Sequence, residues 1–345
     1  MSNLVDVAVA NRFAARFAAS GALAQSYLLD GLQASFDEIV REAEPLIAEE
    51  SGFRPAEPAV ARVLSRDEWA TANVGSMLEL MSPLLDRVQD RMASRGTPGA
   101  RMAYGAALGA QLGTVLGFLS QRVLGQYDIL MAHQNQVWFV GPNIVLMERQ
   151  HGFIPRDFRL WVALHELTHR AQFEANGWVR PYFLSLVSQM IGSMDLDAKT
   201  LLDRMAGALK PAAKNGDPAI PLAFRLLEPE QLEIFNRLQA FMSVIEGHGN
   251  FVMDRAAGNR IPSQPRMSAV LRGGGTIVGP VAKIIGKLLG FELKKAQYVQ
   301  GQKFFDAVYA AAGSAAVRAC FESEKKLPSL EEVRAPELWL KRVGL

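Results

Sequence analysis

Cysteine is nearly absent from the sequence. Cys320 is the only one among 345 residues, which excludes an internal disulfide framework and any zinc ribbon held by cysteines. Such sparing use of cysteine suits a reducing compartment. The N-terminus also lacks a basic stretch ahead of an apolar run, and Asp6 interrupts the one short run there. We therefore expect no secretory signal and a cytoplasmic location.

The chain also lacks an excess of charge of either sign. It has 37 Lys and Arg residues against 35 Asp and Glu residues, and its formal net charge is +2. No block of like charges stands out, so we expect no nucleic-acid partner. Hydrophobic residues make up 49% and charged residues 21% of the chain, as in ordinary globular proteins. This length and composition allow a substantial core without disulfides or metal staples.

Long hydrophobic runs are scarce, with one exception. Residues 102–119 carry no charge and just reach the length that spans a bilayer. Within them Gly105, Gly109, Gly113 and Gly117 recur at every fourth position. Such a ladder suits either a membrane helix with a dimerisation face or a buried soluble helix against which a second backbone packs closely. Polar residues dilute the run and the sequence has no second span of similar quality, so we favour the buried helix and expect no membrane association.

Apolar residues at helical spacing dominate the rest of the sequence. The strongest strand candidate is 136–148, which is rich in Val, Ile and Phe and which Pro142 confines to a sheet edge or a bulge. Helices are expected at 4–50 (two or more), 66–93 (a pair broken near Pro83), 158–175 (from Asp157 as N-cap to Asn176-Gly177), 230–255 and 281–323, with an irregular flap at 261–275. The inward positions expected in the first region are Phe13, Phe17, Leu28, Leu32, Phe36, Ile39 and Leu46. We expect a mainly α fold with a small β-sheet, forming a single domain over 1–345 with an N-terminal helical layer at about 1–95.

The residues from His165 to His169 spell the motif H-E-x-x-H within the best-capped helix of the sequence. Positions i and i+4 of a helix point in nearly the same direction, one turn apart, so these two imidazoles can occupy two corners of one tetrahedral zinc site. Glu166 lies on the flank of the helix, where its carboxylate can reach a water held in the open position. We therefore predict His165 and His169 as metal ligands and Glu166 as a general base.

A catalytic zinc site needs a third protein ligand. The segment 241–254 offers Glu246 and His248, two residues apart on an expected helix and so about 200° from each other around it. A regular helix cannot present both to one metal, although Gly247 and Gly249 could distort the turn. Glu246 is the preferred third ligand, because a glutamate within this apolar run needs a partner, and His248 is the alternative.

Several segments together resemble a known family. HELTHRAQFE, followed downstream by IEGHGNFVMD and FELKKAQYVQGQKFFDAV, is similar to a bacterial family of zincin-like metallopeptidases that are described as uncharacterised hydrolases. SRDEWATANV and LGFLSQRVLGQYD extend the resemblance over most of the chain. Some members of that family are associated with biosynthesis of a deazaflavin cofactor. The resemblance implies a mostly helical, zincin-like metalloprotease architecture in which His165, His169 and Glu246 hold Zn²⁺ and Glu166 is the general base.

Two classes of function fit these residues. The first is a zinc-dependent metallohydrolase, most simply a metallopeptidase, that acts on a peptide or amide bond, with 136–148 offering a sheet edge to an extended substrate. The second is a non-catalytic binding or assembly module of zincin fold, linked to cofactor biosynthesis, in which the helix at 102–119 serves as an interaction surface. We prefer the hydrolase. The substrate and the oligomeric state stay open.

Overall fold

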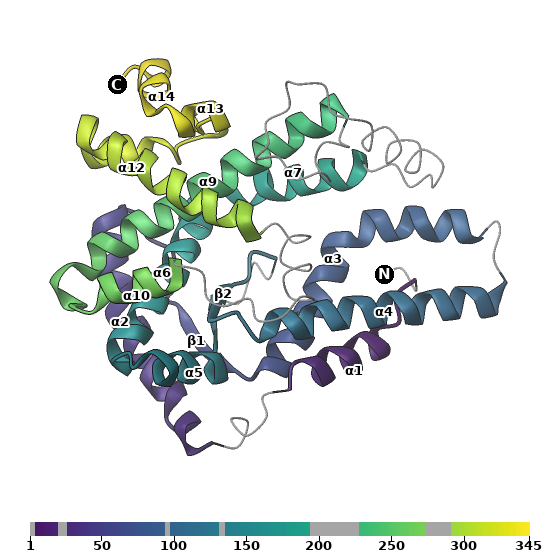
Figure 1. Ribbon diagram of the computed structural model, residues 1–345. Coiled ribbons are helices and arrows are strands. Elements are labelled where there is room, and N and C mark those ends of the chain that lie inside the picture. Colours follow the sequence, from purple (N-terminus) through teal and green to yellow (C-terminus); the bar gives the residue numbers. More distant parts are fainter. Residues whose placement is uncertain (1–3, 20–25, 94–96, 131–134, 194–227, 273–290) are drawn as a thin grey trace, which may run out of the picture.

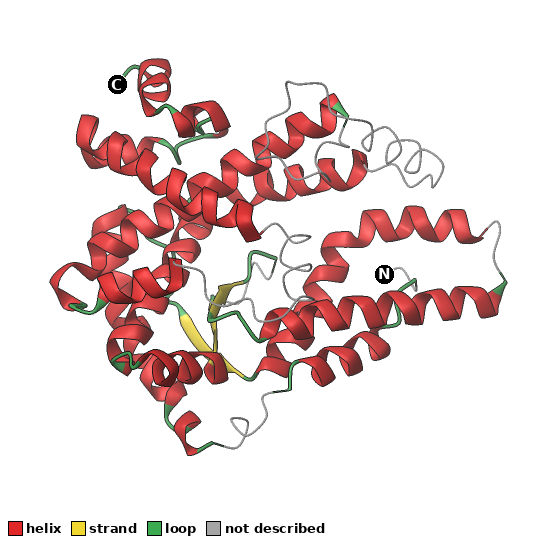
Figure 2. Cartoon of the chain, in the orientation of Figure 1, coloured by secondary structure: helices red, strands yellow, loops and turns green. Residues whose placement is uncertain are grey.

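Most of the chain folds into helices that surround one small β-sheet (Figure 1). The computed structural model describes residues 4–19, 26–93, 97–130, 135–193, 228–272 and 291–345. Figure 2 shows the short strands near the centre of the molecule, with helices on all sides of them. The expected mainly α fold with a small β-sheet is confirmed.

The two central helices of the described chain are α6 and α9, and the largest hydrophobic cluster gathers around them. Before them come α1 (Val7–Phe17), α2 (Leu32–Ser51), α3 (Arg66–Ala93), α4 (Pro98–Ser120) and α5 (Gly141–His151). The later α-helices of the described residues are α6 (Pro155–Ala175), α7 (Val179–Ser193), α9 (Pro229–Ala257), α10 (Gln264–Arg272), α12 (Phe291–Ala319), α13 (Leu330–Arg334) and α14 (Pro336–Val343). Single 3₁₀ turns occur at η2 (Tyr27–Leu29), η4 (Gly258–Arg260) and η5 (Glu324–Lys326).

The strands form a mixed sheet in the order β1-β3-β2. β1 (Val60–Leu64) runs parallel to β3 (Gln136–Val140) along its whole length, and β2 (Gly125–Tyr127) pairs antiparallel with the other side of β3. β3 is therefore the central strand of this sheet and is largely buried. The prediction that 136–148 lies at a sheet edge is wrong, and the edge strands are β1 and β2.

Only the first part of the expected strand is extended. At Gly141 the chain turns into α5, with Pro142 in its first turn. A proline fits there because its missing N–H would have no intrahelical partner and its φ is already helical. Ile144 and Val145 then reach the core from a helix, since burial overrides the strand propensity of β-branched residues.

α6 begins earlier than the expected helix. A proline occupies its first turn, and Ile154 at the N-cap makes no side-chain capping bond. Asp157 is therefore not the N-cap but a first-turn residue, where its carboxylate suits the positive end of the helix dipole and accepts a hydrogen bond from Ser263 Oγ at 2.7 Å. The other end is confirmed, because α6 stops at Ala175 with Asn176 as its C-cap.

The glycine ladder of α4 packs against α1 of the same chain. A Cβ built at Gly105, Gly109, Gly113 or Gly117 would lie 2.8, 2.4, 2.1 or 2.6 Å from a backbone oxygen within residues 4–14. Only glycine allows two backbones to approach this closely. Within the described ranges, α4 is the one helix long and apolar enough to cross a membrane, judged by length and composition only. The ladder nevertheless has its partner inside the chain.

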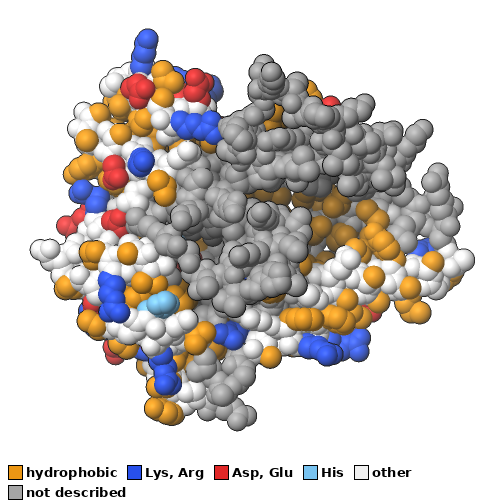
Figure 3. Space-filling model, in the orientation of Figure 1, with side chains coloured by type: hydrophobic (Ala, Val, Ile, Leu, Met, Phe, Trp, Pro, Cys, Tyr) orange, Lys and Arg blue, Asp and Glu red, His pale blue; other side chains and the backbone are white. Residues whose placement is uncertain are grey.

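α1 turns its small residues rather than its aromatic ones toward this ladder. Ala10 and Ala14 are buried, whereas Phe13 and Phe17 stack on each other and are 37% and 42% exposed. The predicted inward orientation of these two rings is wrong, because so close a helix contact leaves no room for them. Hydrophobic side chains are visible over the layer of α1, α3 and α4 in Figure 3. The expected inward positions that are buried are Leu32, Phe36 and Ile39.

Two segments expected to be broken or irregular are helical. Residues 66–93 form one helix, α3, with Pro83 inside it. A proline removes one hydrogen bond of the helix, but packing of α3 against α1 and α4 stabilises the helix on both sides of Pro83. The expected flap at 261–275 contains the helix α10, which packs on α6 and buries Met267; its last residues, 273–275, lie outside the described chain.

α9 confirms the helix expected at 230–255, and α12 crosses it closely. A Cβ at Gly247 would lie 2.2 Å from the backbone carbon of Gly301, so glycines on both helices allow their backbones to meet. α9 is helical through this point, so Gly247 and Gly249 do not distort the turn that carries Glu246 and His248. Of the helical region expected at 281–323, residues 281–290 lie outside the described chain and α12 covers most of the remainder.

Candidate metal centre

α6 brings the two motif histidines together. Their side chains lie one turn apart on the same face, and Nε2 of His165 is 3.1 Å from Nε2 of His169. Both rings are largely buried, with exposed fractions of 17% and 13%. The spacing of the motif thus has the geometric result predicted for it, two imidazole nitrogens that face one point.

α9 supplies a carboxylate to the same point. Oε2 of Glu246 lies 3.7 Å from Nε2 of His165 and 3.5 Å from Nε2 of His169. Bonds of about 2.05 Å from zinc to its ligands place the corners of a tetrahedron about 3.3 Å apart, close to these three separations. Among the described residues, these three side chains form a group whose ligand atoms all lie within 4.8 Å of one another. Two imidazoles and a carboxylate also form an ordinary zinc donor set, so the residues fit the metal.

Gly249 leaves room for the imidazole rings of His165 and His169. It lies three residues after Glu246 on the same face of α9, and a Cβ there would be 3.1 Å from Cε1 of His169 and 3.6 Å from Cε1 of His165. The two glycines that follow Glu246 therefore allow close packing on two sides of α9. Gly247 allows the backbone of α12 to approach, and Gly249 makes room for the two histidine rings.

His248 lies outside this group. It is fully buried, and its ring packs against Phe53, Phe305 and Phe321 with centroid separations of 5.4, 5.2 and 4.7 Å. Burial, together with the charge on His169, lowers the pKa of His248 to about 3. Because α9 is a regular helix here, Glu246 and His248 point about 200° apart, and the structure brings Glu246 rather than His248 to the motif histidines.

Glu166 lies beside the edge strand β2. Its Oε2 accepts a hydrogen bond from the backbone N–H of Tyr127 at 3.2 Å. A Cβ at Gly125 would lie 2.6 Å from Cγ of Glu166, so a glycine is required where the strand passes over this side chain. The general base proposed from the motif is thus held by the edge strand of the sheet.

The charges around His169 favour a cation. Burial alone would lower the pKa of His169, but the carboxylates of Glu246 and Glu166 and a hydrogen bond with Gln172 outweigh it, so that the net pKa is raised. Two carboxylates facing two imidazoles create a negative local field, which is the electrostatic condition for holding a metal ion.

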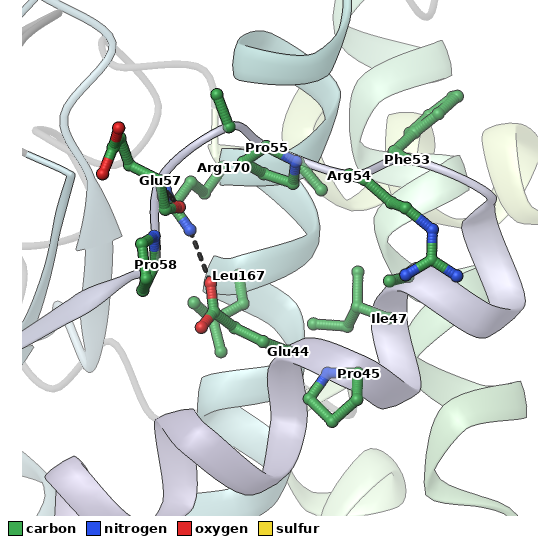
Figure 4. A pocket seen from close by; sticks show the side chains of 13 residues that line it. Glu44, Pro45, Ile47, Phe53, Arg54, Pro55, Glu57, Pro58, Leu167 and Arg170 are labelled. Carbon is green, nitrogen blue, oxygen red and sulfur yellow. Dashed lines mark hydrogen bonds and ion pairs between the residues drawn. The ribbon is translucent and has the colours of Figure 1, made fainter.

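A buried arginine supports the opposite flank of α6. Arg170 is 1% exposed, and its guanidinium lies 2.7 Å from Oε1 of Glu44 and 2.8 Å from Oε2 of Glu174. It also donates to the backbone oxygen of Glu57 at 2.5 Å. Figure 4 shows this arginine and Glu44 on the wall of a cavity of about 280 Å³ between α2, the segment before β1 and α6. The network joins the motif helix to α2, and no sequence pattern pointed to it.

The comparisons with known proteins agree with this geometry. The chain belongs to the family described as zincin-like metallopeptidases, whose sequence profile matches residues 5–340. It is also similar to a crystal structure from Chloroflexus aurantiacus described as a "putative hydrolase with a novel fold", with 32% sequence identity, a TM-score of 0.75 and 99% of each chain covered. No curated protein matches. The resemblance stated from the motifs is confirmed, and family, neighbour and ligand geometry together support a metallohydrolase.

Proposed function

We propose that this protein is a zinc-dependent hydrolase of peptide or amide bonds. The observation that carries the proposal is the convergence of Nε2 of His165, Nε2 of His169 and Oε2 of Glu246 from two helices. Three protein ligands from the described part of the chain would leave one position of a tetrahedral ion open, which is typical of a catalytic site and not of a closed structural one.

His165, His169 and Glu246 would hold the zinc. When bound, zinc would lower the pKa of a coordinated water toward neutrality and polarise the carbonyl of the substrate. In this proposal, Glu166 accepts the proton of the attacking water and passes it to the leaving amine. The hydrogen bond from Tyr127 N–H holds one oxygen of the Glu166 carboxylate and so limits its rotation.

β2 supports a peptide as the substrate class. It is an edge strand, and Tyr127 turns its backbone N–H toward Glu166 and away from β3. Residues two apart on a strand present their backbone groups to the same side, so Gly125 shares this orientation. An extended peptide can add to such an edge through main-chain hydrogen bonds, which would place its backbone beside the proposed base.

The proposal is tested with purified protein, metal analysis and a library of quenched fluorescent peptides. We expect about one zinc per chain, lost in the double variant His165→Ala, His169→Ala. Glu166→Gln should keep the zinc and lose at least about 100-fold of the hydrolysis rate. The matched control is Glu230→Gln, which changes an exposed glutamate at the start of α9 and should leave both quantities unchanged. Full turnover in Glu166→Gln would contradict the proposed mechanism.

The same experiment separates the alternative function. A wild-type protein that holds zinc but cleaves none of the peptides would favour a non-catalytic binding or assembly module. A wild-type protein that binds no zinc after metal is supplied would remove both the metal centre and the hydrolase.

A further inference from the structure

Gln172 connects the two helices that carry the candidate ligands. It lies three residues after His169 on α6 and is fully buried. Its Oε1 is 2.9 Å from Nδ1 of His169. Its Nε2 is 2.9 Å from the backbone oxygen of Ile245 and 2.9 Å from Nδ1 of His248. One amide group thus touches a motif histidine, the backbone beside Glu246 and the histidine that lies outside the metal group.

The backbone oxygen of Ile245 determines the direction of each hydrogen bond in this chain. A carbonyl oxygen only accepts, so the Gln172 atom that faces it must be the donor nitrogen. The same nitrogen donates its second hydrogen to His248, whose Nδ1 must therefore be the unprotonated acceptor. The amide oxygen then faces His169, whose Nδ1 must carry the proton and donate it.

These directions fix the tautomers of both histidines. His169 with its proton on Nδ1 presents the lone pair of Nε2 toward His165 and Glu246, as a metal ligand requires. His248 carries its proton on Nε2, a buried atom that has no hydrogen-bond partner among the described residues and belongs to a ring surrounded by Phe53, Phe305 and Phe321. This aromatic packing holds the His248 ring in place, and the ring in turn holds the amide.

We propose that Gln172 and His248 are positioning residues of the metal centre: together they select the metal-binding tautomer of His169 and fix the position of α6 relative to Glu246 on α9. The proposal rests on the proposed function. A ligating histidine usually donates its second ring N–H to a carboxylate, a backbone carbonyl or a water. A neutral amide in that place adds no further negative charge to a site that Glu166 and Glu246 already make acidic.

Two variants of His248 separate positioning from packing. His248→Phe keeps a ring among the aromatic neighbours but removes the acceptor for Gln172. His248→Asn keeps an acceptor, since Oδ1 of asparagine occupies the place of Nδ1, but removes the ring. Zinc affinity is measured by competition with a chromophoric chelator, and stability by thermal unfolding of the metal-free protein.

The two His248 variants should rank in opposite orders for zinc affinity and for thermal stability. His248→Phe should weaken zinc binding about 10- to 100-fold, the range found for partners of metal ligands, and should be the more stable of the two variants. His248→Asn should bind zinc within a few-fold of wild type and unfold at a lower temperature. Gln172→Leu, which removes all three bonds, should weaken zinc binding at least as much as His248→Phe.

A measurement without metal tests the same proposal. Nitrogen-15 NMR of histidine-labelled, metal-free protein, recorded at a pH above the raised pKa of His169, should show neutral His169 protonated on Nδ1 alone and His248 protonated on Nε2, with assignments made from His169→Asn and His248→Asn. Proton positions opposite to these would overturn the proposal. Zinc affinity unchanged by His248→Phe would also overturn it, as would weaker zinc binding in the less stable of the two His248 variants. If wild-type protein itself bound no zinc, the proposed function would fall and the positioning role with it. Tight zinc binding by every variant would remove the positioning role alone.

Discussion

Gly249 on α9 faces His169 on α6 so closely that a Cβ at position 249 would lie 3.1 Å from Cε1 of the imidazole. A Cβ at this position would therefore require the His169 ring to shift by a few tenths of an ångström where α9 brings Glu246 to the motif histidines. The packing of the candidate metal centre thus involves a residue that is not itself a candidate ligand.

Gly249→Ala should weaken zinc binding about tenfold, because the histidine rings must shift away from the added methyl group. A suitable control is Gly75→Ala on α3, where an added Cβ would meet no atom within 4 Å. Chelator competition measures both variants. Equal affinities in the two would show that the rings adapt without loss.

Gly113→Ala should destabilise the layer of α1 and α4 by about 3 kcal/mol or more, since the added Cβ would lie 2.1 Å from the backbone oxygen of Ala10 and the two helices must separate. The same Gly75→Ala variant should instead gain up to about 1 kcal/mol from helix propensity. Urea denaturation followed by circular dichroism compares them. Unchanged stability of Gly113→Ala would contradict the packing described for the ladder.

Arg170→Met should destabilise the protein by about 3–5 kcal/mol, because it leaves the carboxylates of Glu44 and Glu174 without their buried partner. Arg156→Met is the matched control, since Arg156 forms an ion pair with Glu42 in which both side chains are well exposed. Such a surface pair contributes about 0–1 kcal/mol. Similar losses in both variants, measured by chemical denaturation, would argue against a special role for the buried network.

Glu332 gives the protein a pH-dependent contribution to stability. Burial would raise the pKa of Glu332, but hydrogen bonds from Arg342 and from the backbone N–H of Ser329 to its carboxylate outweigh it and lower the net pKa. A carboxylate whose pKa is depressed on folding stabilises the folded state above its unfolded pKa, about 4.3, and loses that effect as the pH falls through its folded pKa.

Glu332→Gln isolates this charge, because a glutamine can keep the capping bond to Ser329. The variant should be less stable than wild type by about 1 kcal/mol at pH 7, and the difference should shrink as the pH falls from the unfolded pKa of about 4.3 through the lower folded pKa. Unfolding curves recorded from pH 3 to pH 7 test this dependence. A difference that stayed constant over that range would falsify the electrostatic explanation.

Cys320 should be inert in the folded protein. Burial raises the pKa of its thiol well above the ordinary value, so little of it is the reactive thiolate. Labelling with a thiol reagent at pH 8 should be slow without denaturant and fast in guanidinium chloride. Rapid labelling of the native protein would show that α12 opens near its C-terminal end.

Several elements could be predicted because one local pattern dominates them. α6 and α9 follow from apolar residues at helical spacing, and the i, i+4 placement of His165 and His169 follows from the geometry of any helix. The segment 136–148 is not wholly a strand because Val and Ile suit a strand and a buried helix equally well, and Pro142, which also fits an edge strand or a bulge, starts a helix here. The exposure of Phe13 and Phe17 could not be predicted, because helical periodicity does not show which face of α1 will pack against the glycines of α4.

The sequence by itself determined the motif helix, the helical class of the fold and the two candidates for a third ligand, since these depend on residue types at short separations. The tertiary structure alone decided which of Glu246 and His248 lies beside the motif histidines, because that depends on how α9 crosses α6. It also decided that Gln172, which no spacing distinguished, joins His169 to His248. Contacts between residues more than 70 positions apart arise from the packing of whole helices. That packing depends on backbone oxygens and on glycines that allow close approach, as well as on the candidate ligands.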